Sequence, residues 1–137
     1  MRRLFFSLSF CLFLLAGPAL AEPMVSVDLN KLEPRESACR AYLVLENSTE
    51  QAFTAFTLDL YIFGPDGVIT KRLAVDTDPL LPNKTRVRPV DIRDTACDRV
   101  TKVLLNDVLD CADAAGQRSD CVGFVTLSSH TDAEFIK

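Results

Sequence analysis

The side chains best suited to chemistry are four of the five cysteines, Cys39, Cys97, Cys111 and Cys121. The fifth, Cys11, lies in the first 21 residues, which are expected to be removed as a secretion signal. The Cys-x-x-Cys spacing that favours a redox pair or a zinc site is absent. An even number of cysteines in a short exported chain is typical of structural disulfides. Three pairings exist for four cysteines. The short polar stretch between Cys111 and Cys121 favours a local bond, which leaves Cys39 for Cys97.

A row of basic residues is the second set. Lys84, Arg86 and Arg88 alternate along the chain, so that on a strand they share one face. Such a row can form a patch for an anionic partner, for example a phospholipid headgroup or an acidic envelope protein. On an edge strand the same charges also discourage edge-to-edge aggregation. The sequence leaves both interpretations open.

The sequence does not contain a recognisable set of catalytic residues. The single histidine, His130, lies between Ser128 and Asp132, and neighbours in sequence do not form a catalytic triad, so a solvated tail is expected. Acidic residues recur around the last two cysteines, but their spacing does not match a calcium loop. An enzyme would have to use carboxylates such as Asp59 or Asp91. We therefore expect no catalytic residue, no metal and no cofactor.

The first 21 residues have the features of a secretion signal. Arg2 and Arg3 precede twelve mostly apolar residues, and Ala19-Leu20-Ala21 supplies the small-x-small pattern of a cleavage site. Twelve helical residues span about 18 Å, less than the roughly 30 Å of a bilayer core. The paired arginines resemble part of a twin-arginine motif, but general secretion is favoured because the polar residue before them is missing.

Residues 22–137 then form one expected domain in the periplasm of a Gram-negative cell, or secreted beyond it. Without Arg2 and Arg3 this part holds 13 basic and 19 acidic residues, a net charge of −6. That balance argues against binding nucleic acid. After the signal no apolar run is long enough to form a stable membrane span.

Alternation of apolar and polar residues predicts strands rather than helices. In the strongest run, 54–63, Phe56, Leu58, Leu60 and Ile62 share one face while Thr57 and Asp59 lie opposite. Gly64-Pro65-Asp66-Gly67 predicts a hairpin turn. Further strands are expected over 24–30, 38–47, 68–76, 85–92, 98–106 and 121–128, with a break at 34–37 and a final helical turn or docking end. About seven strands at regular spacing favour an all-β antiparallel sandwich stapled by two disulfides.

Several motifs also suggest a family resemblance. They are Leu45-Glu46-Asn47-Ser48-Thr49, Leu58-Asp59-Leu60-Tyr61, the turn Gly64-Pro65-Asp66-Gly67-Val68-Ile69 and the crossover Leu80-Leu81-Pro82-Asn83-Lys84-Thr85. With them the chain resembles the immunoglobulin-like modules of bacterial envelope proteins. The resemblance implies an immunoglobulin-like sandwich that acts as a binding or spacer unit.

The whole chain is also similar to a group of small exported proteins of alphaproteobacteria with a twin-arginine-like signal. The shared segments are Cys39-Arg40-Ala41-Tyr42, the stretch from Val103 to Cys111, and the late cysteine. This second resemblance implies a periplasmic location and no particular activity.

Our leading hypothesis is a periplasmic, non-enzymatic module that binds or supports another envelope component. The first alternative is a small secreted enzyme that uses carboxylates. The second is a secreted inhibitor or ligand-capturing protein, which would need an exposed apolar patch, for example around Phe53 and Phe63.

Overall fold

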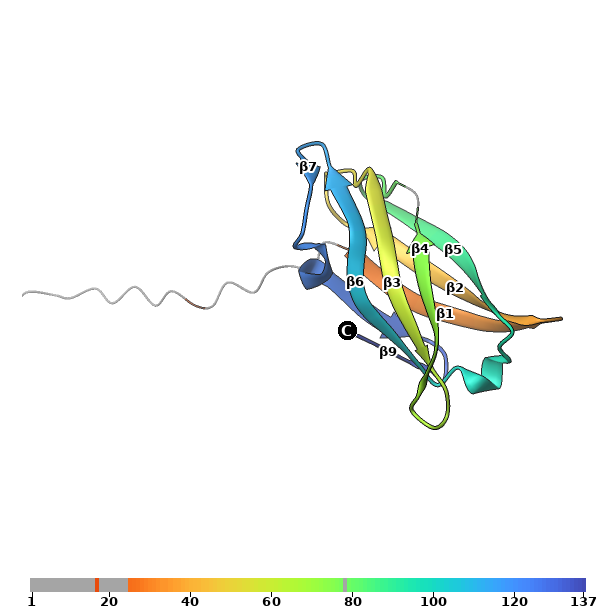
Figure 1. Ribbon diagram of the computed structural model, residues 1–137. Helices are drawn as coiled ribbons and strands as arrows, with labels where there is room; N and C mark the ends of the chain where they lie inside the picture. Colours follow the sequence, from red (N-terminus) through yellow and green to blue (C-terminus); the bar gives the residue numbers. More distant parts are fainter. Residues whose placement is uncertain (1–16, 18–24, 78) are drawn as a thin grey trace, which may run out of the picture.

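The computed structural model describes Gly17 and residues 25–77 and 79–137 (Figure 1). The expected signal at 1–21, apart from Gly17, lies outside the described residues. The described chain is an all-β sandwich of two packed sheets with nine strands. The predicted all-β sandwich is therefore confirmed. The count exceeds the expected seven because two of the strands, which span two and three residues, are too short to leave a sequence pattern.

The first sheet has the strand order β5-β2-β1-β8. Its strands are β1 (Val25–Arg35), β2 (Ala38–Asn47), β5 (Lys84–Arg93) and β8 (Val125–Ser129). The break expected at 34–37 is narrower than predicted. β1 continues to Arg35, and only Glu36 and Ser37 form the turn into β2.

The second sheet has the order β4-β3-β6-β7, with β9 also paired to β6. Its strands are β3 (Ala55–Phe63), β4 (Ile69–Asp76), β6 (Lys102–Asp113), β7 (Gly116–Gln117) and β9 (Glu134–Ile136). Two short 3-10 turns, η1 (Cys97–Arg99) and η2 (Cys121–Phe124), precede β6 and β8. The tail expected as a helical turn or docking end is thus a strand, and η2 replaces the first part of the strand expected at 121–128.

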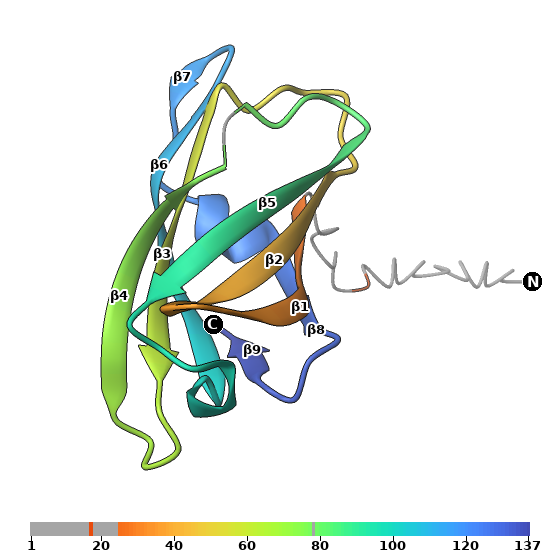
Figure 2. The same ribbon diagram turned by 90° about the vertical axis from the view of Figure 1, so that its right-hand side faces the viewer.

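The C-terminal strands bring the two sheets together on one side of the sandwich. After β8 in the first sheet the chain passes to β9 in the second, where the two strands lie side by side (Figure 2). β8 and β9 run parallel to their neighbours β1 and β6, so the fold is not purely antiparallel. On the opposite side, β5 and β4 are the edge strands of the two sheets.

The hairpin turn between β3 and β4 forms as the residue types predict. Gly67 has a φ of 76°, a left-handed conformation that glycine adopts without strain. The Gly67 amide donates to the Gly64 carbonyl at 2.9 Å, and the Asp66 carboxylate accepts from the Val68 amide at 3.1 Å. The turn therefore fixes the register in which β3 and β4 pair.

The core lies between the sheets and follows the predicted alternation. Phe56, Leu58, Leu60 and Ile62 of β3 are buried, and each such side chain contributes about 1.5–3 kcal/mol on burial. Phe53, suggested as part of an exposed patch, is instead fully buried, with its ring 5.5 Å from that of Phe56. That suggestion was wrong, because the bridge from Phe53 to Leu80 turns the ring inward.

Candidate functional site

Both disulfides form with the predicted pairing. Cys39 of β2 is bonded to Cys97 of η1, and Cys111 of β6 is bonded to Cys121 of η2. The first bond ties η1 to the end of the β1–β2 hairpin, and the second ties η2 to the second sheet. All four sulfurs are therefore structural, and within the described ranges no three His, Cys, Asp or Glu side chains gather as a metal site would require.

The basic row lies on β5, and its three members share one face as expected. Across the β2–β5 pairing, Arg88 is opposite Leu43 and Arg86 is opposite Leu45. Because both leucines are buried, this is the face that the first sheet turns toward the second. Lys84 and Arg86 are nevertheless exposed and Arg88 is half-buried, so the second sheet leaves this end of β5 uncovered.

The two arginines of this row are held by the rest of the chain. Arg86 donates from Nη1 to the Pro79 carbonyl at 3.5 Å, and both Arg86 and Arg88 have further interaction partners. A small pocket of about 200 Å³ lies next to the row and is lined by residues of the β4–β5 connection and the start of β5. Leu81, one of its apolar side chains, is 50 % exposed.

The carboxylates proposed for an enzyme do not converge. Asp59 is on β3 and faces away from the core side chains Leu58 and Leu60. Asp91 is on β5 and faces away from the buried Ile92. The two aspartates thus lie on opposite outer faces of the sandwich, with the core between them.

Each of these carboxylates is also engaged by an arginine. Asp59 accepts from Arg72 Nε at 2.7 Å and from Asn106 Nδ2 at 2.9 Å. Asp91 accepts from Arg40 Nε at 2.6 Å and Nη2 at 2.8 Å. In each case the arginine hydrogen bond is the main cause that lowers the pKa of the aspartate below its ordinary value, while desolvation acts in the opposite sense. A general acid would need the reverse shift.

A Ser, His and Asp do meet in space, although not in triad order. Asp28 of β1 accepts from Ser128 Oγ at 2.7 Å and lies 2.9 Å from His130 Nδ1. Burial raises the pKa of Asp28, but hydrogen bonds from Asn30, Ser128 and His130 outweigh it and lower the pKa. In a triad the serine would contact the histidine rather than the aspartate. The cluster instead fastens β8 to β1. Ser128, His130 and Asp132 are exposed, as a solvated segment requires, but the segment is held by these contacts.

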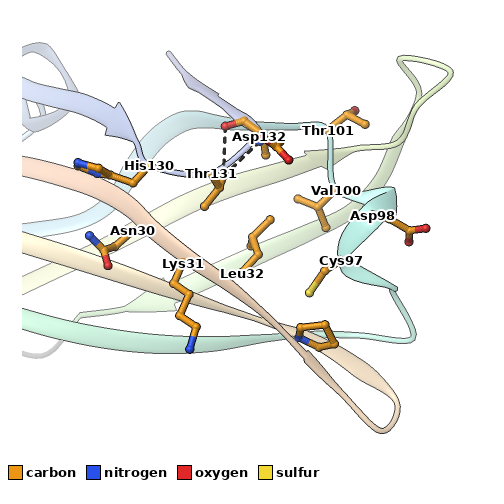
Figure 3. A pocket seen from close by; sticks show the side chains of 12 residues that line it. Asn30, Lys31, Leu32, Cys97, Asp98, Val100, Thr101, His130, Thr131 and Asp132 are labelled. Atoms are coloured by element: carbon orange, nitrogen blue, oxygen red, sulfur yellow. Dashed lines mark hydrogen bonds between the residues drawn. The ribbon is translucent and has the colours of Figure 1, made fainter.

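Near this cluster lies an open groove of about 640 Å³ (Figure 3). It runs between the second half of β1, η1 and the loop that joins β8 to β9. Leu32 and Val100 point toward one another across its floor, where Cys97 and Ala133 add apolar surface. Asn30, Thr101, His130 and Asp132 give it a polar rim.

Sequence reasoning did not find this groove. Its residues come from three separate segments, 30–34, 97–101 and 130–133, and none of these carries a motif. The one signal available is the polar run from Ser128 to Asp132, which is mostly exposed as expected but does not by itself indicate a groove.

The acidic residues near the second disulfide also have structural partners. Arg118 donates to Asp113 at 3.1 Å and to Asp120 at 2.9 and 3.0 Å, so this one cation bridges two of the carboxylates. Within the described residues no helix has the length and apolar character to cross a membrane. Comparisons of the chain with protein-family models, with curated proteins and with solved structures found no match.

Proposed function

We propose that this protein is an exported, non-enzymatic binding module of the periplasm, which contacts an acidic envelope component through the basic end of β5. The observation that carries the proposal is the row of Lys84, Arg86 and Arg88 at an uncovered edge of the sandwich. Cations on an edge strand attract an acidic partner and orient it before contact.

The surroundings of the row suit a protein partner. The pocket beside Lys84 and Arg86 exposes Leu81, so a partner could bury an apolar side chain there while its carboxylates meet the cations. The contact of Arg86 with the Pro79 carbonyl limits the freedom of its side chain before binding. Less conformational entropy is then lost when a partner arrives.

A non-enzymatic role is supported by how the carboxylates are used. Asp59, Asp91 and Asp28 each accept hydrogen bonds that lower the pKa, and Asp59 and Asp91 are separated by the core. An acid–base pair would instead need groups that face one substrate with pKa values pushed apart. The immunoglobulin-like resemblance of the sequence, with its binding or spacer units, points the same way.

The compartment is part of the proposal. Two disulfides in a chain of this size suit an oxidising environment, and the predicted signal supplies a route to it. Secretion beyond the cell is the alternative location.

The test is affinity capture with protein purified from the periplasm, so that both disulfides are formed. The immobilised protein is exposed to solubilised envelope extract, and captured proteins are quantified by mass spectrometry. We expect an acidic protein whose capture falls about tenfold in the Lys84→Glu/Arg86→Glu variant and decreases with added salt.

The matched control is Arg93→Glu/Arg99→Glu, which changes the net charge equally at exposed positions away from Lys84 and Arg86. Capture that falls equally in both variants would reflect bulk charge and would remove β5 as the contact. If every captured protein is retained by the Lys84→Glu/Arg86→Glu variant, the proposal is wrong.

A further inference from the structure

A second surface, remote from the basic row in sequence, has the features of a strand-addition site. β2 pairs with β1 along its whole length to Arg35, whereas β8 pairs with β1 only from Val25 to Leu29. The His130 amide still donates to the Leu29 carbonyl at 3.0 Å, after which the chain turns away to β9. From Asn30 to Arg35, one edge of β1 therefore has no neighbouring strand in the described part of the chain.

The backbone at this edge has groups ready to pair. Arg35 and Ala38 flank the two-residue turn and form a hydrogen-bonded pair. Hydrogen-bonded and non-hydrogen-bonded pairs alternate in an antiparallel ladder, so Leu32, opposite Ala41, directs its N–H and C=O away from β2. Pro34 lies at the equivalent position two residues later and offers only its carbonyl.

The groove lies directly along this edge. An added strand would take the place that β8 leaves, with every second side chain directed onto the floor of Leu32, Val100 and Ala133. Backbone pairing at an edge, with a pocket for alternate side chains, is the way in which proteins bind extended peptides. A groove that held a compact small molecule would not need this backbone edge.

Charge indicates what kind of segment fits. Asp132 at the groove is an exposed carboxylate that forms no ion pair with any described residue. The Asp98 carboxylate, also exposed and without an ion pair to the described part of the chain, projects outward from η1 beside the groove (Figure 3). The lining cation Lys31 is already bonded to Glu33 at 3.1 Å. The groove therefore complements a segment with lysine or arginine side chains.

We propose that this groove binds an extended segment of a partner polypeptide, which adds to the free edge of β1 as a strand and presents a basic side chain to Asp98 and Asp132. The two proposed contacts are independent. The β5 row selects an acidic surface, while the groove selects a basic extended segment.

The first experiment measures charge selection. A blocked seven-residue peptide of alternating valine and lysine is titrated by calorimetry against the periplasmic protein, beside a peptide in which glutamate replaces lysine. We expect saturable binding of the lysine peptide and at least about tenfold weaker binding of the glutamate peptide. An absence of measurable binding of the lysine peptide at millimolar concentration overturns the proposal.

Two variants distinguish binding in the groove from general electrostatic attraction of the peptide to this acidic protein. The Asp98→Asn/Asp132→Asn variant should bind the lysine peptide about tenfold more weakly. The control Glu46→Gln/Asp110→Asn removes two exposed charges elsewhere and should leave affinity within about twofold. Equal losses of affinity in the two variants would show that the peptide does not bind specifically in the groove.

The backbone contact is tested by Leu32→Pro against Leu32→Ala. Both variants lose the leucine side chain, but only Leu32→Pro loses the N–H, and Pro34 shows that the strand accepts proline at such a position. We expect Leu32→Pro to bind about fivefold more weakly than Leu32→Ala. Equal affinities overturn strand addition.

Hydrogen exchange of the Leu32 amide provides a readout in the unaltered protein. The lysine peptide should slow this exchange at least about tenfold, whereas unchanged exchange at saturation contradicts the proposal.

Discussion

Each outer face of the sandwich carries an aspartate–arginine pair between neighbouring strands, and the two pairs differ mainly in burial. Asp59 of β3 meets Arg72 of β4 at 2.7 Å, and Asp91 of β5 meets Arg40 of β2 at 2.6 Å. The Asp59 side chain is 1 % exposed, whereas that of Asp91 is 41 % exposed. The carboxylate is thus shielded from water in the first pair and accessible to it in the second, while the Arg72 side chain of the first pair is itself 55 % exposed.

Strand position explains the difference. β3 is flanked by β4 and β6, so both sides of Asp59 are covered, while Asp91 lies on the edge strand β5. A bulge in β6 supplies the extra residue Asn106, whose amide closes over the Asp59 carboxylate at 2.9 Å. The Arg72 guanidinium also lies over the Tyr61 ring, 5.5 Å from its centre.

Hydrogen-bond geometry alone therefore does not rank the two ion pairs by their contribution to stability. A buried carboxylate that loses its cation remains desolvated, and that penalty is large. An exposed carboxylate that loses its cation regains water, so the net loss is small. Three experiments test whether burial of the carboxylate decides how much each pair stabilises the fold.

The largest effect is expected for Arg72→Leu, which leaves the Asp59 carboxylate covered but without its cation. We expect Tm to fall by about 10 °C in calorimetry near pH 7. Arg72→Lys, which keeps the positive charge, should recover part of the loss. A fall no larger than that of Arg40→Leu, the matched variant on the other face, would show that the burial of Asp59 has no energetic consequence.

An intermediate effect on Tm is expected when the pH is lowered. The hydrogen bond from Arg72 lowers the pKa of Asp59 below its ordinary value of 3.8, so the ionised form is favoured in the folded state. The resulting stability is present above the unfolded pKa and is lost as pH falls through the lowered, folded pKa. Between pH 6 and pH 2 the native protein should therefore lose about 5 °C more in Tm than Asp59→Asn does.

Other aspartates with lowered pKa values, including Asp28 and Asp120, are present in both proteins, so the difference between the two Tm curves isolates Asp59. Parallel curves across this pH range would contradict the assignment.

The smallest effect is expected for the exposed pair. Asp91→Asn should change Tm by no more than about 2 °C at low salt, and the change should shrink further in 0.5 M salt because the pair is screened by water and ions. The measurement is thermal unfolding followed by circular dichroism at both ionic strengths. A loss comparable with that of Arg72→Leu would mean that the exposed pair has a structural role its accessibility does not indicate.

Much of the fold follows from local patterns in the sequence. The alternation of residues 54–63 predicts which side chains of β3 are buried, and Gly64-Pro65-Asp66-Gly67 predicts the hairpin that follows. The four cysteines and the polar stretch between Cys111 and Cys121 predict both disulfides. The Cys39–Cys97 bond joins residues 58 positions apart and follows only because the local bond leaves these two cysteines. The other features are local because side-chain direction on a strand, turn conformation and short-loop closure each depend on a few adjacent residues.

The candidate surfaces depend on contacts between distant segments. The sequence by itself places Lys84, Arg86 and Arg88 on one face of a strand, but only the strand order puts that strand at an uncovered edge. It shows Asp59 as a polar residue opposite a core face, yet the bulge at Asn106 and the position of Arg72 decide that its carboxylate is buried. The free edge of β1 exists because β8 stops pairing at Leu29 and crosses to the other sheet. Side-chain direction is set by neighbours in the chain, whereas burial and strand edges are set by which segments pack together in three dimensions.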